Sequence, residues 1–363
     1  MERQFRVSLA RVSLNMLLFV AASPVLAQTV PAAPQPQAAG PGNRDISLMV
    51  TVTDKSGQPV FGLTAADFTL LDDKHSSRIV GFHAYTGAAE EADPITTAVV
   101  VFDTVNTTFT EVSYARQQVE NYLRQNGGHL PIPLAVYWLT NDGVQAQPQA
   151  TRDGNALAAQ LDAADSRLRT IRRSAGVYGA IERFQFSVRL LADLAGDESR
   201  KPGRKLLIWA GPGWPMLNAP GLDYSAKTQR VLFGQIVALS TLLREGHIEL
   251  DSISEGMPDP FTFMYGSFLK GVKKPSEATP SNLSLKVLAV QSGGLVLNPT
   301  NDLAASLAAC VRDAGAFYIL TFQPPPADGP NEYHDLKVKL DKPGLTARTN
   351  TGYYNQPSLV GSN

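Results

Sequence analysis

The chain has 363 residues, of which 44% are apolar and 18% are charged, so it has the length for two ordinary domains and the apolar content for a buried core. Its formal net charge is −1 and no block of like charge interrupts it, which excludes a nucleic acid as the expected partner. The single cysteine, Cys310, excludes an intramolecular disulfide, and its apolar helical neighbours predict a core residue.

The first residues follow the order of a secretory signal peptide. Three arginines precede an apolar run over residues 12–22, and Ala27 closes a small-residue cleavage motif. The run is shorter than the about 20 residues that a transmembrane helix needs. We therefore expect residues 1–27 to be removed near Ala27, leaving a periplasmic or secreted protein without a transmembrane span. An uncut signal anchor is the alternative.

Residues 28–44 are rich in proline, alanine and glutamine, which predicts a disordered linker. The next segment, residues 45–86, predicts short β-strands separated by turns. These strands are expected at 46–53, 68–71 and 79–85. Because so few short strands are not stable alone, they need partners elsewhere in the chain.

From residue 95 to 313, buried strands alternate with amphipathic helices. Residues 98–102 form a continuous apolar run that ends at Asp103, as expected of a strand buried on both faces of a parallel sheet. Further strands are predicted at 134–139, 205–210, 248–253 and 294–297, and helices at 112–124, 156–168, 181–194, 229–244, 283–291 and 303–311. This alternation predicts an α/β domain with a doubly wound, mostly parallel sheet and right-handed crossovers.

The β pattern returns over residues 316–354, with strands expected at 317–322, 333–340 and 345–354. The simplest arrangement pairs these strands with those of residues 45–86. The α/β domain is then inserted into one small β-sandwich. Two separate β units are the alternative.

Several segments together resemble one known family. The buried strand ending in Asp103 is followed by a hydroxyl-rich loop over residues 104–108 and then by a helix. Further matching segments are 50–54, 62–68, 114–116, 182–185, 211–215, 301–303 and 348–354. Over about residues 45–354 the chain resembles von Willebrand factor A (VWFA) domains, specifically the VWFA-related proteins of acidobacteria. The resemblance implies a von Willebrand A or Rossmann-like fold.

Von Willebrand A domains often hold a divalent cation, and the resemblance implies Asp103 and Thr107 as its ligands here. Such a site needs several oxygen ligands and one position left open for a carboxylate of the partner. Three family ligands are replaced: Val105 and Val177 stand at hydroxyl positions, and residues 210–212 lack the later aspartate. We therefore expect a degenerate metal site, with no cofactor beyond weak Mg²⁺ or Mn²⁺ binding.

With so few ligands, Asp103 is expected instead to brace its loop or to cap the next helix by accepting backbone N–H groups. Asn106 and Thr108 of the same loop are candidate ligand-binding residues. The loop lies at the carboxyl end of a strand, where open α/β sheets bind their ligands.

The segment 254–282 is a second candidate for ligand binding. It follows a predicted strand and shows little regular pattern, and long irregular loops in compact domains are often functional. Its candidate residues are aromatic: Phe261, Phe263, Tyr265 and Phe268. The alternative is that these aromatic side chains pack over a helix.

No nucleophile–base motif or metal-ligating histidine spacing is present in the sequence. We therefore expect a non-enzymatic, exported binding or adhesion module whose partner is a protein or another cell-envelope macromolecule. Three alternatives remain open: a metal-dependent adhesion domain with a live cation site, an envelope hydrolase whose active site the sequence does not reveal, and a purely structural envelope protein.

Overall fold

The computed structural model describes residues 45–86, 96–140, 142–146, 149–164, 176–217, 224–255 and 260–357. The predicted signal peptide and linker lie outside these residues. The described residues belong to one compact unit, Pro41–Asn363. Among them, no helix combines the length and apolar character needed to cross a bilayer.

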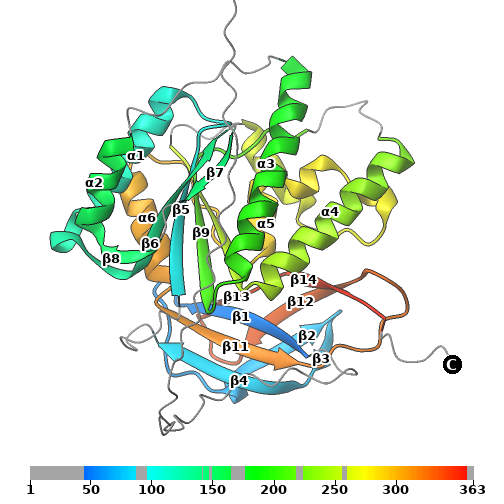
Figure 1. The fold of residues 1–363 in the computed structure, drawn as a ribbon. Helices are drawn as coiled ribbons and strands as arrows, with labels where there is room; N and C mark the ends of the chain where they lie inside the picture. Colours follow the sequence, from blue (N-terminus) through cyan, green and yellow to red (C-terminus); the bar gives the residue numbers. More distant parts are fainter. Residues whose placement is uncertain are drawn as a thin grey trace, which may run out of the picture. The chain divides into compact units, whose positions relative to one another are not determined.

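A six-stranded sheet organises residues 96–313, with the strand order β10-β9-β5-β6-β7 and with β8 also paired to β6 (Figure 1). Its parallel strands are β5 (Thr96–Asp103), β6 (His129–Thr140), β9 (Arg204–Ala210) and β10 (Ile248–Ile253). Two short antiparallel strands complete it, β7 (Gly143–Ala146) and β8 (Thr151–Asp153). The predicted mixed α/β organisation around a mostly parallel sheet is therefore confirmed.

Helices cover both faces of this sheet. Successive side chains of each strand point to opposite faces, and since both sets are apolar here, both faces have to be buried. Val99 and Val101 of β5 pack in one core with α3, α4 and α5, whereas Val100 and Phe102 pack in another with α1, α2 and α6 (Figure 1). The helices are α1 (Phe109–Leu123), α2 (Gly154–Ala164), α3 (Gly176–Ser199), α4 (Ala226–Glu245), α5 (Leu285–Gln291) and α6 (Leu303–Asp313). Cys310 of α6 is fully buried, as expected.

Two four-stranded antiparallel sheets form the rest of the described chain, and each combines N-terminal with C-terminal strands. The first has the order β13-β1-β11-β4 and contains β1 (Ile46–Thr53), β4 (Ile79–Thr86), β11 (Ala316–Phe322) and β13 (Thr346–Arg348). The second, β14-β12-β2-β3, contains β2 (Phe68–Asp72), β3 (His75–Ser77), β12 (Glu332–Leu340) and β14 (Gly352–Asn355). Residues from both sheets share one core, including Leu48, Leu70, Leu320 and Val338.

Three predicted elements differ from the structure. The strand expected at 294–297 is reduced to a single bridge between Ser252 and Val296. Ser284 has extended backbone angles and divides the helix expected at 283–291 into a 3-10 turn (Pro280–Leu283) and α5. The last predicted strand is likewise split into β13 and β14. Residues 165–168 of the helix expected at 156–168 lie outside the described residues.

Buried charges join the parallel sheet to the strand-rich part. Arg204 at the start of β9 is paired with Glu249 of β10, and it also donates to Thr51 Oγ1 of β1 at 3.0 Å. Arg348 of β13 is paired with Asp313 at the end of α6. Burying a charge is costly unless it is paired, and here the Arg204–Thr51 hydrogen bond and the Arg348–Asp313 ion pair link the two parts.

Candidate functional site

The carboxyl ends of β5 and β9 flank the point where the strand order of the parallel sheet reverses. The chain passes from β5 to β6 on one side, and β9 then adds on the other side of β5. Open α/β sheets bind ligands in the crevice outside such a switch point. Asp103 ends β5 there and is fully buried, and Gly211 directly follows β9.

Both oxygens of the Asp103 carboxylate accept hydrogen bonds from the protein. Oδ1 accepts the backbone N–H groups of Val105 at 3.0 Å and Asn106 at 2.9 Å. Oδ2 accepts the Asn106 side-chain amide at 2.9 Å and the Trp209 indole N–H at 3.1 Å. Burial raises the pKa of Asp103, whereas these donors favour its charged form. Since a carboxylate offers about four lone-pair sites, a cation has to displace existing donors to bind here.

The loop after β9 approaches Asp103 closely. A Cβ added at Gly211 would lie 3.2 Å from both the Asp103 Cβ and the Thr107 Oγ1, so this glycine allows the loop after β9 to approach closely. The rings of Trp209 and Trp214 meet edge to face with centroids 5.4 Å apart. Among the described residues, the loop after β9 therefore packs directly against Asp103 and Thr107.

The helix cap predicted for Asp103 is made by another residue. Thr108 is the N-cap of α1: its Oγ1 accepts the Glu111 N–H at 3.3 Å, and its own N–H donates to the Glu111 carboxylate at 2.7 Å. This reciprocal pair is a capping box, which the sequence Thr-x-x-Glu allows. Of the two roles predicted for Asp103, capping the helix is therefore wrong and bracing the loop is confirmed. Asp103 bonds to the loop that precedes the helix.

The other predicted loop residues have distinct environments. Thr107, expected as a second metal ligand, is buried next to Gly211. Asn106 is partly buried, and its amide also donates to Ser187 Oγ of α3 at 2.9 Å. Thr108 is exposed. The sequence reasoning missed Trp209, whose only signal was an indole N–H on a buried strand, a donor that needs an acceptor.

The aromatic segment is more regular than predicted. Pro260–Phe268 forms a 3-10 helix that contacts α5, and Val272 and Ala278 further along are buried against the helices. Tyr265 and Phe268 are half-buried, whereas residues 256–259 and the side chains of Phe261 and Phe263 lie outside the described residues. A ligand-binding role for these four aromatics stays a prediction.

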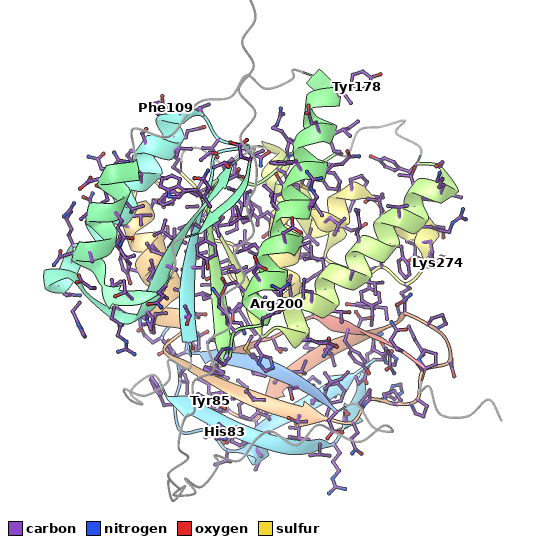
Figure 2. The ribbon with its side chains drawn as sticks, in the orientation of Figure 1. His83, Tyr85, Phe109, Tyr178, Arg200 and Lys274 are labelled. Atoms are coloured by element: carbon purple, nitrogen blue, oxygen red, sulfur yellow. The ribbon has the colours of Figure 1, made fainter. Side chains whose placement is uncertain are left out.

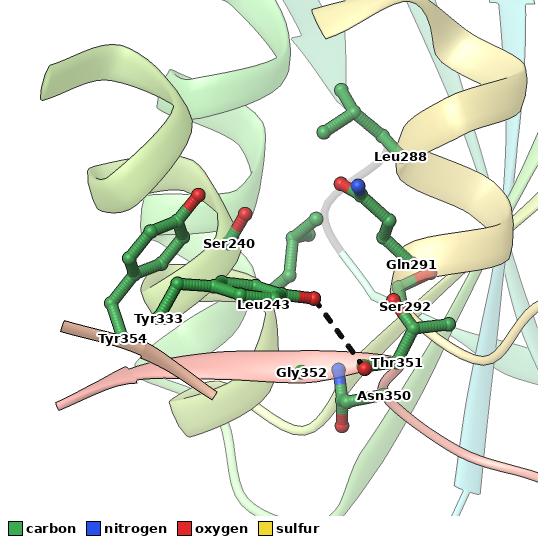
Figure 3. A pocket seen from close by; sticks show the side chains of 10 residues that line it. All are labelled: Ser240, Leu243, Leu288, Gln291, Ser292, Tyr333, Asn350, Thr351, Gly352 and Tyr354. Carbon is green, nitrogen blue, oxygen red and sulfur yellow. Dashed lines mark hydrogen bonds between the residues drawn. The ribbon is translucent and has the colours of Figure 1, made fainter. Parts of the chain in front are cut away.

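A small cavity lies between α4, α5 and the last strands (Figure 3). Its volume is about 20 Å³, and polar groups line much of it, including Ser240, Ser292 and Asn350. The Tyr333 hydroxyl donates to the Thr351 carbonyl at its edge, at 3.5 Å. A space of this size and polarity suits about one water molecule. It is too small for an organic substrate.

No protein-family model and no curated protein matches this sequence. Solved structures give distant likenesses. Human COPII-coat protein Sec24c is 9% identical with a TM-score of 0.39, covering 76% of this chain and 46% of that one. The pilus adhesin SpaC from Lactobacillus rhamnosus GG is 9% identical with a TM-score of 0.34, covering 80% and 42%. The N-terminal domain of TFIIH p34 is 11% identical with a TM-score of 0.27, covering 60% and 97%.

The chain thus spans less than half the length of the first two of these structures. At such TM-scores the neighbours establish neither a family nor a function.

We predict that Mg²⁺ does not stabilise the protein through Asp103, because the donors from Val105, Asn106 and Trp209 occupy its oxygens. Mg²⁺ also gives up its water shell reluctantly. A cation bound only to the folded state would add about 2.7 kcal/mol at a hundredfold excess over its Kd. Thermal melts in millimolar Mg²⁺ and in chelator should therefore overlap. An upward shift that Asp103→Asn abolishes would show a live cation site.

Proposed function

We propose that this chain is an exported, von Willebrand A-type binding module that docks a partner protein at the carboxyl edge of its parallel sheet. Binding occurs through an exposed apolar surface, without a metal and without a catalytic step. The observation that supports this most is the exposure of Phe109, Val177 and Tyr178, which are 47%, 63% and 86% accessible. Export rests on the signal-peptide pattern of residues 1–27.

These three side chains lie on the first turns of α1 and α3, two helices that begin at the same edge of the sheet. Helix α1 follows directly on the Asp103 loop, and Ser187 of α3 contacts Asn106 of that loop. At about 1.5 Å per residue, the first turn of α3 extends about 16 Å past this contact. Figure 2 shows Phe109 and Tyr178 at this end of the α/β part.

The site suits protein recognition better than chemistry. The Asp103 carboxylate is buried and accepts hydrogen bonds at both oxygens, which argues against a direct role in chemistry. The exposed groups are two aromatic rings and a branched aliphatic side chain. Tyrosine and phenylalanine are enriched at protein interfaces, and tyrosine recurs among the residues that dominate binding energy. The Asn106–Ser187 hydrogen bond joins the loop that leads into α1 to the middle of α3.

The experiment compares wild-type protein with the triple variant Phe109→Ser, Val177→Ser, Tyr178→Ser. Each protein is immobilised and incubated with envelope extract from cells that produce it, and retained proteins are quantified by mass spectrometry. We expect at least one partner to be retained by wild type and reduced at least tenfold by the variant. A tenfold loss corresponds to about 1.4 kcal/mol, which truncation of a few interface anchors readily exceeds.

A matched control replaces the same number of exposed apolar residues elsewhere: Phe61→Ser, Val80→Ser, Val231→Ser, at positions that are 54%, 43% and 55% accessible. This control should retain the partner. The proposal fails if the same proteins are retained by all three baits, or if the control loses them as completely as the variant.

A further inference from the structure

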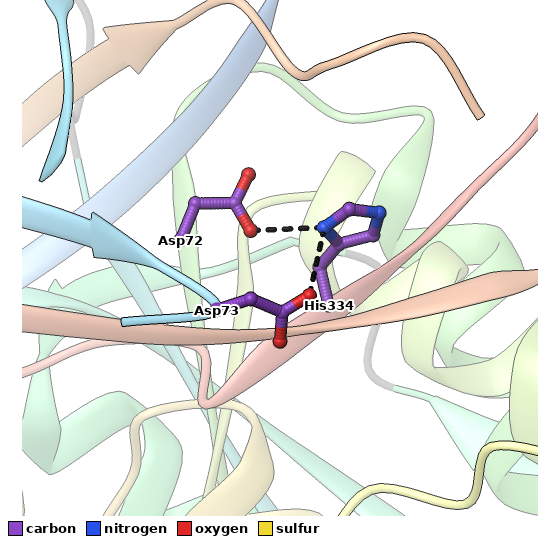
Figure 4. A group of neighbouring side chains, drawn as sticks. All are labelled: Asp72, Asp73 and His334. Atoms are coloured by element: carbon purple, nitrogen blue, oxygen red, sulfur yellow. Dashed lines mark hydrogen bonds and ion pairs between the residues drawn. The ribbon is translucent and has the colours of Figure 1, made fainter. Parts of the chain in front are cut away.

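A second polar cluster lies in the strand-rich part of the protein (Figure 4). It consists of Asp72 at the end of β2, Asp73 in the following turn and His334 of β12. The His334 Nδ1 lies 3.0 Å from Asp72 Oδ1 and 3.2 Å from Asp73 Oδ2, and the three atoms all lie within 4.8 Å of one another. Ligand atoms that share one transition-metal ion, each at about 2.0–2.2 Å from it, are separated by about 3 Å.

Strand pairing brings these residues together although they are distant in sequence. Leu336 of β12 pairs with Asp72 of β2, which places His334 near the β2–β3 turn. Asp73 and Lys74 form that turn with positive φ angles of 45° and 73°, as in the tightest hairpins. This backbone presents the Asp73 carboxylate to the same imidazole nitrogen as Asp72.

The carboxylate oxygens of Asp72 and Asp73 that do not face Nδ1 accept hydrogen bonds from other groups. Asp72 Oδ2 accepts the Tyr353 hydroxyl at 2.8 Å, and Asp73 Oδ1 accepts the backbone N–H of Asp335 at 3.1 Å. The His334 ring stacks on Tyr353 with centroids 4.9 Å apart and planes 15° from parallel. Second-layer contacts of this kind orient metal ligands, and here they leave one oxygen of each carboxylate facing Nδ1.

The opposite ring nitrogen gives an independent indication. The His334 side chain is only 8% exposed, and its buried Nε2 has no hydrogen-bond partner among the described residues. The Glu332 Oε1 lies 3.9 Å from this nitrogen. A metal on Nδ1 fixes the ring proton on Nε2, where it faces Glu332. A histidine between a metal and a carboxylate is the usual arrangement in metal sites.

A bound cation would also explain why two carboxylate oxygens lie close to Nδ1. This nitrogen carries at most one proton, yet two carboxylate oxygens face it. A divalent ion instead balances the two carboxylate charges and uses all three atoms. Asp73 is 40% exposed, so solvent reaches the cluster from that side and can supply further ligands.

We propose that Asp72, Asp73 and His334 bind one divalent first-row transition-metal ion of the Zn²⁺ class. The imidazole nitrogen selects against Mg²⁺ and Ca²⁺, which prefer all-oxygen sites. The ion links the N-terminal β2–β3 hairpin to the C-terminal strand β12. The site lies outside the Asp103 loop and does not depend on the proposed docking function.

The test uses the untagged mature chain after dialysis against chelator. Zn²⁺ is titrated calorimetrically, and Co²⁺ is titrated by its visible absorption, which reports the ligand field directly. We expect one ion per chain. Asp73→Asn should weaken binding at least tenfold, because the variant keeps the Oδ1 acceptor for Asp335 N–H but replaces the metal-facing oxygen with an amide NH₂.

His334→Gln is the second variant and should abolish the Co²⁺ spectrum. His83→Gln removes an exposed histidine from the other sheet and should leave Zn²⁺ binding unchanged, as should Asp103→Asn. Circular dichroism checks that each variant is folded. The proposal is overturned if folded wild type binds neither ion, which would leave the cluster as a plain ion pair. Binding that survives both Asp73→Asn and His334→Gln overturns it equally.

Discussion

Arg204→Ala is expected to lower the free energy of unfolding by about 3–5 kcal/mol, the usual cost of removing one partner of a buried ion pair. The Arg204 side chain is fully buried and its partner Glu249 is 4% exposed, so the variant leaves a carboxylate buried without its main counter-charge. It also removes a donor to Thr51 and the guanidinium that lies 5.0 Å from the Phe317 ring centroid. Urea unfolding followed by circular dichroism measures the loss.

Two comparisons separate this effect from general sensitivity to arginine loss. Arg200→Ala breaks an ion pair in which both side chains are more than 70% exposed, and it should cost less than about 1 kcal/mol. The double variant Arg204→Met, Glu249→Leu removes both charges and should recover most of the stability, because the Arg348–Asp313 pair remains balanced. A single variant as stable as wild type would contradict the interpretation.

Asp251→Asn is expected to remove a loss of stability that the wild-type protein undergoes as the pH rises. Burial and, second, the nearby charge of Glu249 together raise the pKa of Asp251 from 3.8 to about 7. A carboxyl group whose pKa is raised by folding stabilises the folded protein. This stabilisation is complete below pH 4 and is lost as the pH rises towards 7. The asparagine has no such titration, and its Oδ1 still accepts the Leu295 N–H that Asp251 accepts at 2.6 Å.

The measurement is the free energy of unfolding of wild type and Asp251→Asn from pH 4 to pH 8. Relative to wild type, the variant should gain about 4 kcal/mol across this range, the equivalent of the shift from 3.8 to about 7. Asp197→Asn, at a 71% exposed side chain, should show no such pH-dependent gain. Parallel curves for wild type and Asp251→Asn would rule out a protonated Asp251 in the folded protein.

Much of the α/β part could be predicted because its signals are local. The apolar run at residues 98–102 identifies β5, and the helical spacing of apolar residues identifies α1, α3 and α4. Element ends were less predictable. His75–Ser77 has little β propensity and becomes a strand because the turn before it folds it back on β2. Its position is decided by pairing with a neighbour, which no local pattern encodes.

The position of the candidate site could be predicted from the sequence better than the hydrogen bonds within it. The position of Asp103 at the end of a buried strand follows from the sequence, but the donor from Trp209 comes from a different strand. The same limit applies to His334, which meets Asp72 only through the β2–β12 pairing. Neither contact can be recognised from a fixed spacing in the sequence, because each joins two segments that are distant along the chain.

The pairing of β1 with β11 has a consequence for the order of folding. Ile46 pairs with Phe322 and Val50 with Tyr318, so the first described strand finds its partner only after most of the chain has been made. Until then its backbone N–H and C=O groups and its apolar face are exposed, as in other proteins dominated by long-range strand pairing. The parallel strand pairings of the α/β part, such as Thr96 with Arg204, all join strands that precede β11 in the chain, so this sheet can form earlier. We therefore expect closure of the two antiparallel sheets to be the late step, and the chain to be most prone to aggregation before it.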